Sequence, residues 1–327
     1  MGVIRVGTSS WANASLVKDS DFYPPTVRTA EERLRFYATQ FPLVEVDSTF
    51  YRLPTERLIA TWDERTPPDF VFNVKAFRVF TLHPCPPGML PADLRGALPL
   101  PAASKPNVYW YDLPAELQTD LWERFERALR PLHRTGKLGA VLLQFPPWVL
   151  PSNQSRQHIL DARRALAEYR LAIEFRDVSW VSQKNIERTM EFLAQNNLTF
   201  VCVDEPQIGR TLPPIVRVTT PDLAIVRLHG RNADAWKRRA ESAAERSRYL
   251  YEERELREWV PRLEELADRT AETHAVFNNA YRDYAVRNAR QLIALLERAE
   301  LPVRMMHIPA HAEREVGDAE VWSGATA

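Results

Sequence analysis

The sequence predicts a TIM-like (β/α)8 barrel that forms a single domain, and three observations support this prediction. The chain has 327 residues, enough for one large α/β domain. Short β-rich runs alternate with helical patterns along it. The runs match the eight strands of such a barrel: Val3–Gly7, Val44–Asp47, Phe70–Lys75, Gly139–Gln144, Leu171–Arg176, Thr199–Asp204, Ala224–His229 and His274–Asn278. A doubly wound sheet is the rival fold, but no glycine-rich phosphate loop follows the first run.

Helical patterns lie between these runs. The clearest runs from about Ala30 to Gln40, where Thr29 and Glu32 have the spacing of a capping box. Further apolar faces at helical spacing follow Pro114, cover 256–266 and begin near Tyr281. We therefore expect helices to cover the outside of the barrel.

Two segments depart from the regular strand–helix unit of the barrel, which we assign to residues 1–300. Residues 83–114 are rich in proline and predict a long loop after the third strand. Its aromatic residues favour a lid packed over a site, whereas a loop resting on the surface is an equally simple interpretation. The tail, residues 301–327, has little periodicity, and we expect it to be partly disordered.

The composition narrows the classes of partner. Acidic and basic residues number 43 each, so the net charge is zero. Such a balance does not favour broad binding to nucleic acid or to an anionic membrane. Cys85 and Cys202 are the only cysteines, which suits a reducing compartment. Because the N-terminal residues show no signal peptide and no apolar run is long enough to cross a bilayer, we expect a cytoplasmic protein.

Alternation within the strands predicts which side chains face the lumen, because successive strand residues point to opposite faces. In the fifth run, apolar Ile173 and Phe175 share one face, and Glu174 and Arg176 share the other. If the apolar faces pack against helices, the charged faces point inward. The same rule applied to the other runs predicts this inward set: Arg5, Glu45, Asp47, Lys75, Glu174, Arg176, Asp204, Arg227, His229 and Arg231.

The inward charges fall into two groups. Arg5, Glu45 and Arg227 come early in their strands, and we interpret them as ion pairs that support the core. The others come at the strand ends, where barrel enzymes carry their sites. We predict one polar site there, which contains Asp47, Lys75, Glu174, Arg176, Asp204, His229, Arg231 and Asn278.

Three chemistries suit this site. Glu174 and Asp204 would form an acid–base pair, with His229 as the third catalytic candidate; alternatively, Glu174 only pairs with an arginine. The preferred interpretation is an anion site, in which Lys75, Arg176, His229 and Arg231 hold a phosphate or a carboxylate. A magnesium or manganese ion at Glu174, Asp204 and His229 is less favoured, and we assign neither a metal nor a cofactor.

Further polar and aromatic residues beside the strand ends complete the predicted ligand contacts. Trp11 and Tyr51 would stack on a sugar or a base, and the asparagines would donate hydrogen bonds. Arg78 and His83 are weaker candidates in the loop after the third strand. The full ligand-binding prediction comprises Trp11, Asp47, Tyr51, Lys75, Gln144, Arg176, Arg231, Asn232, Asn278, Asn279 and Tyr281.

Several short motifs resemble the YecE-like family, also known as domain of unknown function 72, over about residues 1–300. They include Gly7-Thr8-Ser9-Ser10-Trp11, Val44-Glu45-Val46-Asp47-Ser48-Thr49-Phe50-Tyr51, Phe72-Asn73-Val74-Lys75, Leu143-Gln144-Phe145-Pro146-Pro147, Ala172-Ile173-Glu174-Phe175-Arg176, Val203-Asp204-Glu205-Pro206, Arg227-Leu228-His229-Gly230-Arg231-Asn232 and Phe277-Asn278-Asn279. The resemblance implies a TIM barrel without a settled activity. The family's barrels are similar to those of sugar isomerases and abasic-site endonucleases.

Two hypotheses for the function follow. The first is binding of a phosphorylated or nucleotide-like anionic ligand at the C-terminal face, with hydrolase or lyase chemistry carried by carboxylates. The alternative is a non-catalytic accessory protein that holds nucleic acid or a protein partner. The balanced charge weakens the nucleic-acid form of the alternative.

Overall fold

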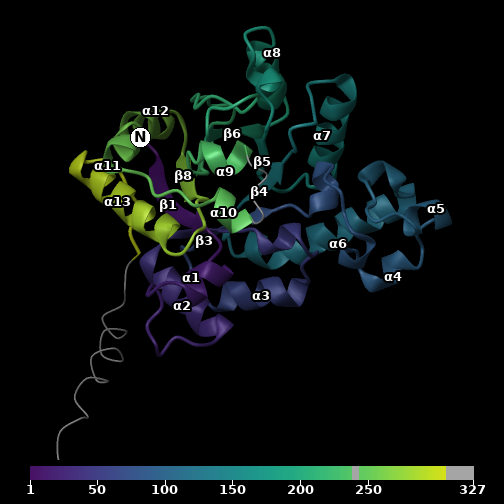
Figure 1. Ribbon diagram of the computed structural model, residues 1–327, viewed down its shortest axis with the longest axis horizontal. Helices are drawn as coiled ribbons and strands as arrows, with labels where there is room; N and C mark the ends of the chain where they lie inside the picture. The colour runs from purple at the N-terminus through teal and green to yellow at the C-terminus, as the bar shows by residue number, and fades with distance from the viewer. Residues whose placement is uncertain (238–242, 307–327) are drawn as a thin grey trace, which may run out of the picture.

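In the computed structural model, which describes residues 1–237 and 243–306, eight parallel strands close into a barrel (Figure 1). Each strand pairs with the next, and the last pairs with the first. The strands are β1 (Val3–Ser9), β2 (Leu43–Val46), β3 (Val71–Lys75), β4 (Leu138–Gln144), β5 (Leu171–Glu174), β6 (Leu198–Asp204), β7 (Leu223–Leu228) and β8 (Glu272–Phe277). The predicted fold class and all eight predicted strands are confirmed.

Helices surround the barrel on its outside (Figure 1). The described helices outside the segment between β3 and α6 are α1 (Ala14–Lys18), α2 (Ala30–Gln40), α3 (Glu56–Glu64), α6 (Ala115–Arg134), α7 (Asn153–Ala165), α8 (Ile186–Gln195), α9 (Ala233–Lys237), α10 (Ala243–Arg246), α11 (Glu253–Arg257), α12 (Val260–Arg269) and α13 (Tyr284–Arg298), with the short 3-10 turns η1 (Ser48–Phe50) and η5 (Val178–Val181). Helix α2 has the predicted bounds, and Thr29 and Glu32 form its capping box.

One strand–helix unit departs from the predicted alternation. Residues 205–222, which join β6 to β7 and are all described, contain no helix. Pro206, Pro213, Pro214 and Pro221 lie in this connection. Proline lacks the amide hydrogen that a helix interior needs and clashes with the preceding turn, so this sequence crosses from β6 to β7 without a helix.

The core has two parts. Outward-facing strand residues and the apolar faces of the helices form a large cluster that runs around the barrel. Inside the lumen, Leu43, Val71 and Val276 form a small separate apolar cluster. Glu45, two residues after Leu43 on β2, therefore faces the lumen one layer nearer the C-terminal face. An ionic network occupies that layer.

Strand β6 faces opposite to the prediction. Val203 is the register partner of Arg227, which points into the lumen, and side chains directly opposite on neighbouring strands share a face. Val201 and Val203 therefore face the lumen, while Cys202 and Asp204 face the helices. Because a barrel lumen accepts branched aliphatic side chains as readily as the helix layer does, apolar character alone did not determine the direction of this strand.

The proline-rich segment after β3 is a packed surface insertion rather than a lid over the strand ends. It contains η2 (Arg78–Thr81), η3 (Pro87–Met89), α4 (Ala92–Arg95), α5 (Leu100–Ala103) and η4 (Trp110–Asp112). Figure 1 shows α4 and α5 beyond α6, at the side of the molecule away from the barrel. Trp110 packs edge-on against Trp122 of α6, and Asp93 binds Arg124 of the same helix.

The first residues of the predicted tail pack on the barrel. Val303 pairs with Ile4 of β1, and Arg304 binds Asp69. The rest of that prediction, residues 307–327, lies outside the described residues. Among the described helices, none combines the length and the apolar character that crossing a bilayer requires.

Candidate functional site

Glu174, at the end of β5, is the centre of a buried network at the C-terminal face. Its side chain has no exposed surface. Its carboxylate accepts a hydrogen bond from Gln144 Nε2 at 2.7 Å, forms an ion pair with Arg176 Nε at 2.8 Å, and also binds Arg227. His229 Nε2 lies 3.1 Å from the same carboxylate. The structure thus brings together Gln144, Glu174, Arg176 and His229, as predicted.

Arg227 binds both Glu45, which was also predicted to support the core, and Glu174 of the candidate site. Its guanidinium binds both oxygens of Glu45, at 2.8 Å through Nε and 2.5 Å through Nη2, and it also binds Glu174. All three side chains are buried. Burial alone would raise the pKa of Glu174, but Arg227, Arg176 and His229 outweigh it and hold this pKa well below its usual range. Glu174 is therefore held ionised at neutral pH, which does not suit a general acid.

His229 is held as a neutral imidazole. Burial and the nearby Arg176 lower the pKa of His229 to about 3. Asn278, at the end of β8, has its amide nitrogen 2.9 Å from His229 Nδ1. In a consistent arrangement, Asn278 donates to Nδ1 and His229 donates from Nε2 to Glu174. Asn278 thus orients His229 at the predicted site.

Two cations at the same face have no carboxylate partner among the described residues. The Lys75 ammonium lies 4.5 Å from the centre of the Phe50 ring, and the Arg78 guanidinium lies 5.3 Å from it. Neither forms an ion pair in the described part of the chain. Within the described ranges, Arg78 donates only to the sulfur of Met89, and its buried Nε has no hydrogen-bond partner. The site therefore holds cationic groups for which residues 1–237 and 243–306 supply no carboxylate partner.

The His83 ring lies close enough to these cations to interact with their charges. It lies 5.0 Å from the Phe50 ring. Burial first, and then Lys75, Arg78 and Arg176, lower the pKa of His83 to about 3. Three cations that repel a proton from one imidazole create a positive potential in the space around that imidazole.

Three side chains of the site have pKa values shifted toward neutrality. Burial, followed by repulsion from Arg227, lowers the pKa of Lys75 to about 8. Burial raises the pKa of Asp47 and of Glu205, against the neighbouring cations. Glu205 binds Arg176 and accepts the backbone N–H of Leu212. Groups shifted in this direction exchange protons more readily near pH 7 than ordinary lysines or carboxylates do.

Aromatic side chains lie at the rim of the site. Tyr51 is 50 % exposed and packs edge-on against Phe50. Trp148, which follows β4, is 58 % exposed and lies 5.9 Å from the His83 ring. Trp236 lies 5.4 Å from the Arg176 guanidinium. The predicted Tyr51 is therefore joined by two tryptophans.

Asp204 and Arg231 belong to a different cluster, and their predicted direction was wrong. Asp204 accepts three hydrogen bonds from Arg231, one from Tyr251 at 3.0 Å and one from Trp259 Nε1 at 2.7 Å. Arg231 also binds Glu255, at 3.3 Å. These partners belong to the helix layer, so Asp204 does not form the predicted carboxylate pair with Glu174.

The remaining predicted ligand contacts also lie apart from Glu174. Trp11 is buried in the outer core and packs edge-on against Trp62 and Phe72. Asn232 caps α9 by accepting the N–H of Ala235 and donates to Arg248.

The two residues predicted after β8 have structural contacts. Asn279 is buried and donates to the Tyr249 carbonyl and to Asn288. Tyr281 packs against Arg248 and Tyr284. These contacts of Asn279 and Tyr281 do not involve Glu174.

No grouping of three or more His, Cys, Asp or Glu side chains in the described part of the chain has the arrangement of a metal site. Glu174 and His229 lie together, but Asp204, the third predicted ligand, points into the helix layer. The three predicted ligands therefore do not converge on one ion.

Sequence reasoning underrated several residues of the site. Arg78 and His83 were weaker candidates, and Glu205, Trp148 and Trp236 were not proposed at all. A usable signal existed for two of them: Glu205 directly follows β6, and Trp148 follows the Pro146-Pro147 pair after β4. In a barrel, residues that follow strands build the C-terminal face.

Comparisons with known proteins show which family the chain belongs to. A family model described as "Protein of unknown function DUF72" matches residues 5–313. The chain belongs to this family. UPF0759 protein YunF of Bacillus subtilis is 29 % identical over 299 residues, which cover 90 % of this chain and 95 % of that protein.

Solved structures of DUF72 proteins share the fold. One from Enterococcus faecalis matches with a TM-score of 0.73 and 25 % identity, over 90 % of this chain and 96 % of that one. Another, from Thermotoga maritima, matches with a TM-score of 0.70 and 31 % identity, over 90 % and 99 %. This chain therefore has the barrel fold of the DUF72 family, whose description names no activity.

Proposed function

We propose that this DUF72 protein binds a small phosphorylated or nucleotide-like anion at the C-terminal face of its barrel. The observation that carries the proposal is the pair of cations, Lys75 and Arg78, that flank Phe50 without carboxylate partners in the described residues. Lys75 and Arg78 are partly buried, and an unpaired charge that is partly removed from water is costly, so such groups are retained where a ligand supplies the opposite charge.

Arg176, which follows β5, completes the anion site. Its Nε binds Glu174, which fixes the orientation of the guanidinium. Because Nη1 also binds Glu205, the Nη2 group is the part of this guanidinium that would donate to a phosphate or carboxylate oxygen. The ligand anion would then lie near His83, where Lys75, Arg78 and Arg176 act together.

The exposed aromatics favour a ligand with a flat or apolar part beside its anion. Tyr51 and Trp148 lie on either side of Phe50 and His83 and present half or more of their surface to solvent. Such rings stack on bases and sugars with little dependence on sequence or substituents. A nucleotide or a sugar phosphate has both features.

For catalysis, Lys75 is a better proton carrier than the carboxylate pair predicted from the sequence. Glu174 is held ionised, and Asp204 is bonded in the helix layer. Lys75, with a pKa of about 8, is protonated at neutral pH and lies close enough to Asp47 for the two groups to influence each other. A lyase or hydrolase that uses a lysine as its general acid fits this geometry.

Calorimetric titration with inorganic phosphate, pyrophosphate and a nucleoside monophosphate tests the proposal. A charge-assisted hydrogen bond contributes about 1.5–3 kcal/mol, so Lys75→Met should weaken affinity by about tenfold to a hundredfold. Lys184→Met, at an exposed lysine, removes the same charge and should leave affinity unchanged. If none of the three anions binds the wild type, or if Lys75→Met binds as tightly as the wild type, the proposal is wrong.

A further inference from the structure

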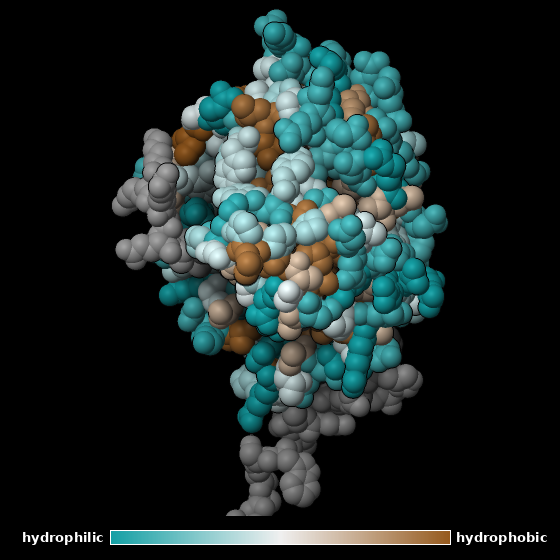
Figure 2. All heavy atoms as spheres, turned by 90° about the vertical axis from the view of Figure 1, so that its right-hand side faces the viewer, coloured by the Kyte–Doolittle hydropathy of each residue, from teal (hydrophilic) through white to brown (hydrophobic). Residues whose placement is uncertain are grey.

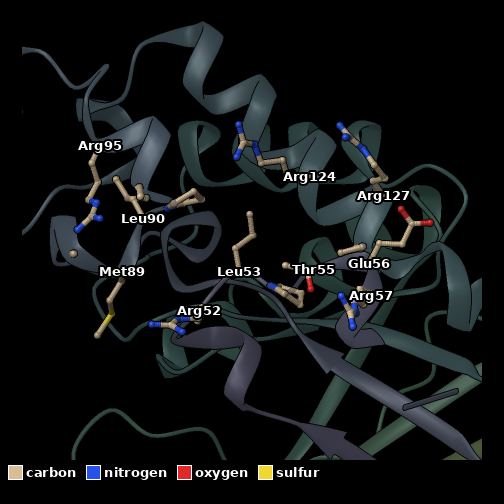
Figure 3. Close-up of a pocket in the computed structure, with 15 residues that line it drawn as sticks. Arg52, Leu53, Thr55, Glu56, Arg57, Met89, Leu90, Arg95, Arg124 and Arg127 are labelled. Carbon is tan, nitrogen blue, oxygen red and sulfur yellow. The ribbon is translucent and has the colours of Figure 1, made fainter. Parts of the chain in front are cut away.

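A second candidate surface lies outside the barrel, and one of its lining residues, Met89, accepts a hydrogen bond from Arg78 of the candidate anion site. It is a groove of about 870 Å³ between α3, the insertion after β3 and α6. Figure 3 shows its lining, with Leu90 and Arg95 on the insertion, Glu56 and Arg57 on α3, and Arg124 and Arg127 on α6. We call it the arginine groove. Figure 2, which views the molecule from the side of the insertion, shows hydrophobic atoms gathered near the middle of a largely hydrophilic face.

The groove combines an apolar floor with a cationic rim. Its apolar lining residues are Leu53, Pro54, Met89, Leu90, Pro91, Ala92 and Ala128. Its charged lining consists of five arginines, Arg52, Arg57, Arg95, Arg124 and Arg127, and a single described acidic residue, Glu56.

Four of these arginines are free to bind a partner. Arg124 is neutralised by Asp93 and Asp120. Arg52, Arg57, Arg95 and Arg127 are exposed and form no ion pair within the described residues. Because the net charge of the whole chain is zero, this concentration of free positive charge is local to the groove and not a property of the whole surface.

The free arginines are spread along the groove rather than gathered at one point. Figure 3 shows Arg52 and Arg95 toward one end and Arg57 and Arg127 toward the other, with Leu53 between them. A single phosphate or carboxylate needs donors that converge. Two separated pairs of cations around an apolar floor instead complement an extended polyanion that carries apolar groups between its charges.

We propose that the arginine groove docks an acidic segment of a partner protein, with apolar side chains between its carboxylates. The apolar residues of that segment would cover Leu53, Met89 and Leu90, and its carboxylates would pair with the two arginine pairs. Nucleic acid fits less well, because none of the lining residues is aromatic, whereas single-stranded nucleic acids bind by stacking on aromatic side chains.

Fluorescence anisotropy with a labelled synthetic peptide of alternating glutamate and leucine tests this proposal on the full chain. The wild type should bind this peptide, and a version with glutamine in place of glutamate should bind at least about tenfold more weakly. Two double variants, Arg52→Glu with Arg95→Glu and Arg57→Glu with Arg127→Glu, should each weaken binding by about tenfold or more.

A matched pair of reversals separates docking from general electrostatics. Arg287→Glu with Arg298→Glu, at exposed positions on α13 on the far side of the barrel, makes the same change in net charge. It should leave peptide affinity unchanged. Leu53→Ser should weaken peptide binding without changing the charge, because it removes apolar contact from the floor.

Three results would overturn the proposal. One is an absence of peptide binding by the wild type. Another is an equal loss of binding in the α13 control. The third is a single-stranded oligonucleotide that displaces the peptide and binds more tightly through the same arginines, which would assign the groove to nucleic acid instead. Melting temperatures check that each variant is folded, and those of the arginine variants should match the wild type because the substituted arginines are exposed.

Discussion

Substituting Glu174→Gln should destabilise the whole barrel as well as its site. The glutamate carboxylate is fully buried and is bonded to donors from Gln144, Arg176, His229 and Arg227. A glutamine amide has the same shape but loses the negative charge, and its NH2 group faces donors instead of an acceptor. Arg227 keeps Glu45, and Arg176 keeps Glu205, but each loses one of its two carboxylates.

The magnitude follows from the burial. Breaking a buried ion pair costs about 3–5 kcal/mol, because a charge is left uncompensated in a medium of low polarity. For a domain of this size, each kcal/mol of lost stability lowers the melting temperature by about 2 °C. The melting temperature should therefore fall by about 6–10 °C. Glu253→Gln, which removes an exposed i,i+4 pair with Arg257, should cost about 0.5 kcal/mol or less.

The measurement is thermal unfolding followed by circular dichroism, repeated over a range of pH. The folded-state pKa of Glu174 is depressed, so its stabilisation is present above the ordinary glutamate pKa and is lost as pH falls through the folded value. The difference between wild type and Glu174→Gln should therefore be full at neutral pH and shrink in acid. A variant that melts within about 1 °C of the wild type at pH 7 would refute the network described here.

The remaining predictions concern other parts of the molecule. Asp204→Asn should destabilise the protein by about 3 kcal/mol in chemical denaturation. It should leave phosphate affinity unchanged, because the partners of Asp204 lie in the helix layer. A loss of phosphate affinity without a loss of stability would show that Asp204 belongs to the anion site. Sulfate affinity should fall as pH rises through about 8, because the Lys75 amine loses its proton there, and Lys75→Met should show no such fall; a pH-independent wild type would contradict the assignment. Thr29→Ala should cost about 1 kcal/mol of unfolding free energy, because it removes the capping box of α2; an unchanged urea midpoint would show that the cap contributes nothing.

The sequence predicted the barrel well because strand count and helix periodicity are local features. Alternation also placed Glu45, Glu174 and Arg227 correctly in the lumen. Each lies between two apolar strand neighbours that pack against the helices, so its own side chain must point to the other face of the strand. It failed for β6. There, Asp204 is satisfied outside the lumen by Arg231, Tyr251 and Trp259, and contacts between residues so far apart in the chain leave no local pattern.

The candidate site was predicted only in part for a related reason. Lys75, Arg176 and Arg231 look equivalent as cations at strand ends. Only tertiary contacts reveal that Arg231 is bound to carboxylates of the helix layer, that Arg176 is shared between Glu174 and Glu205, and that Lys75 has no carboxylate partner among the described residues. Likewise, the richness of 83–114 in proline indicated a long connection but not that it packs on α6 and forms one wall of the arginine groove.

The central claim is that Lys75, Arg78 and Arg176 hold an anion at the C-terminal face. A crystal structure of the wild-type protein grown with inorganic phosphate tests it most directly, with Lys75→Met crystals grown in the same way as the control. We predict phosphate within hydrogen-bonding distance of these three side chains in the wild type and a loss of that phosphate in the variant. A wild-type site in which Asp47 or Glu205 binds Lys75 and Arg78 directly, with phosphate bound only elsewhere, would contradict the claim.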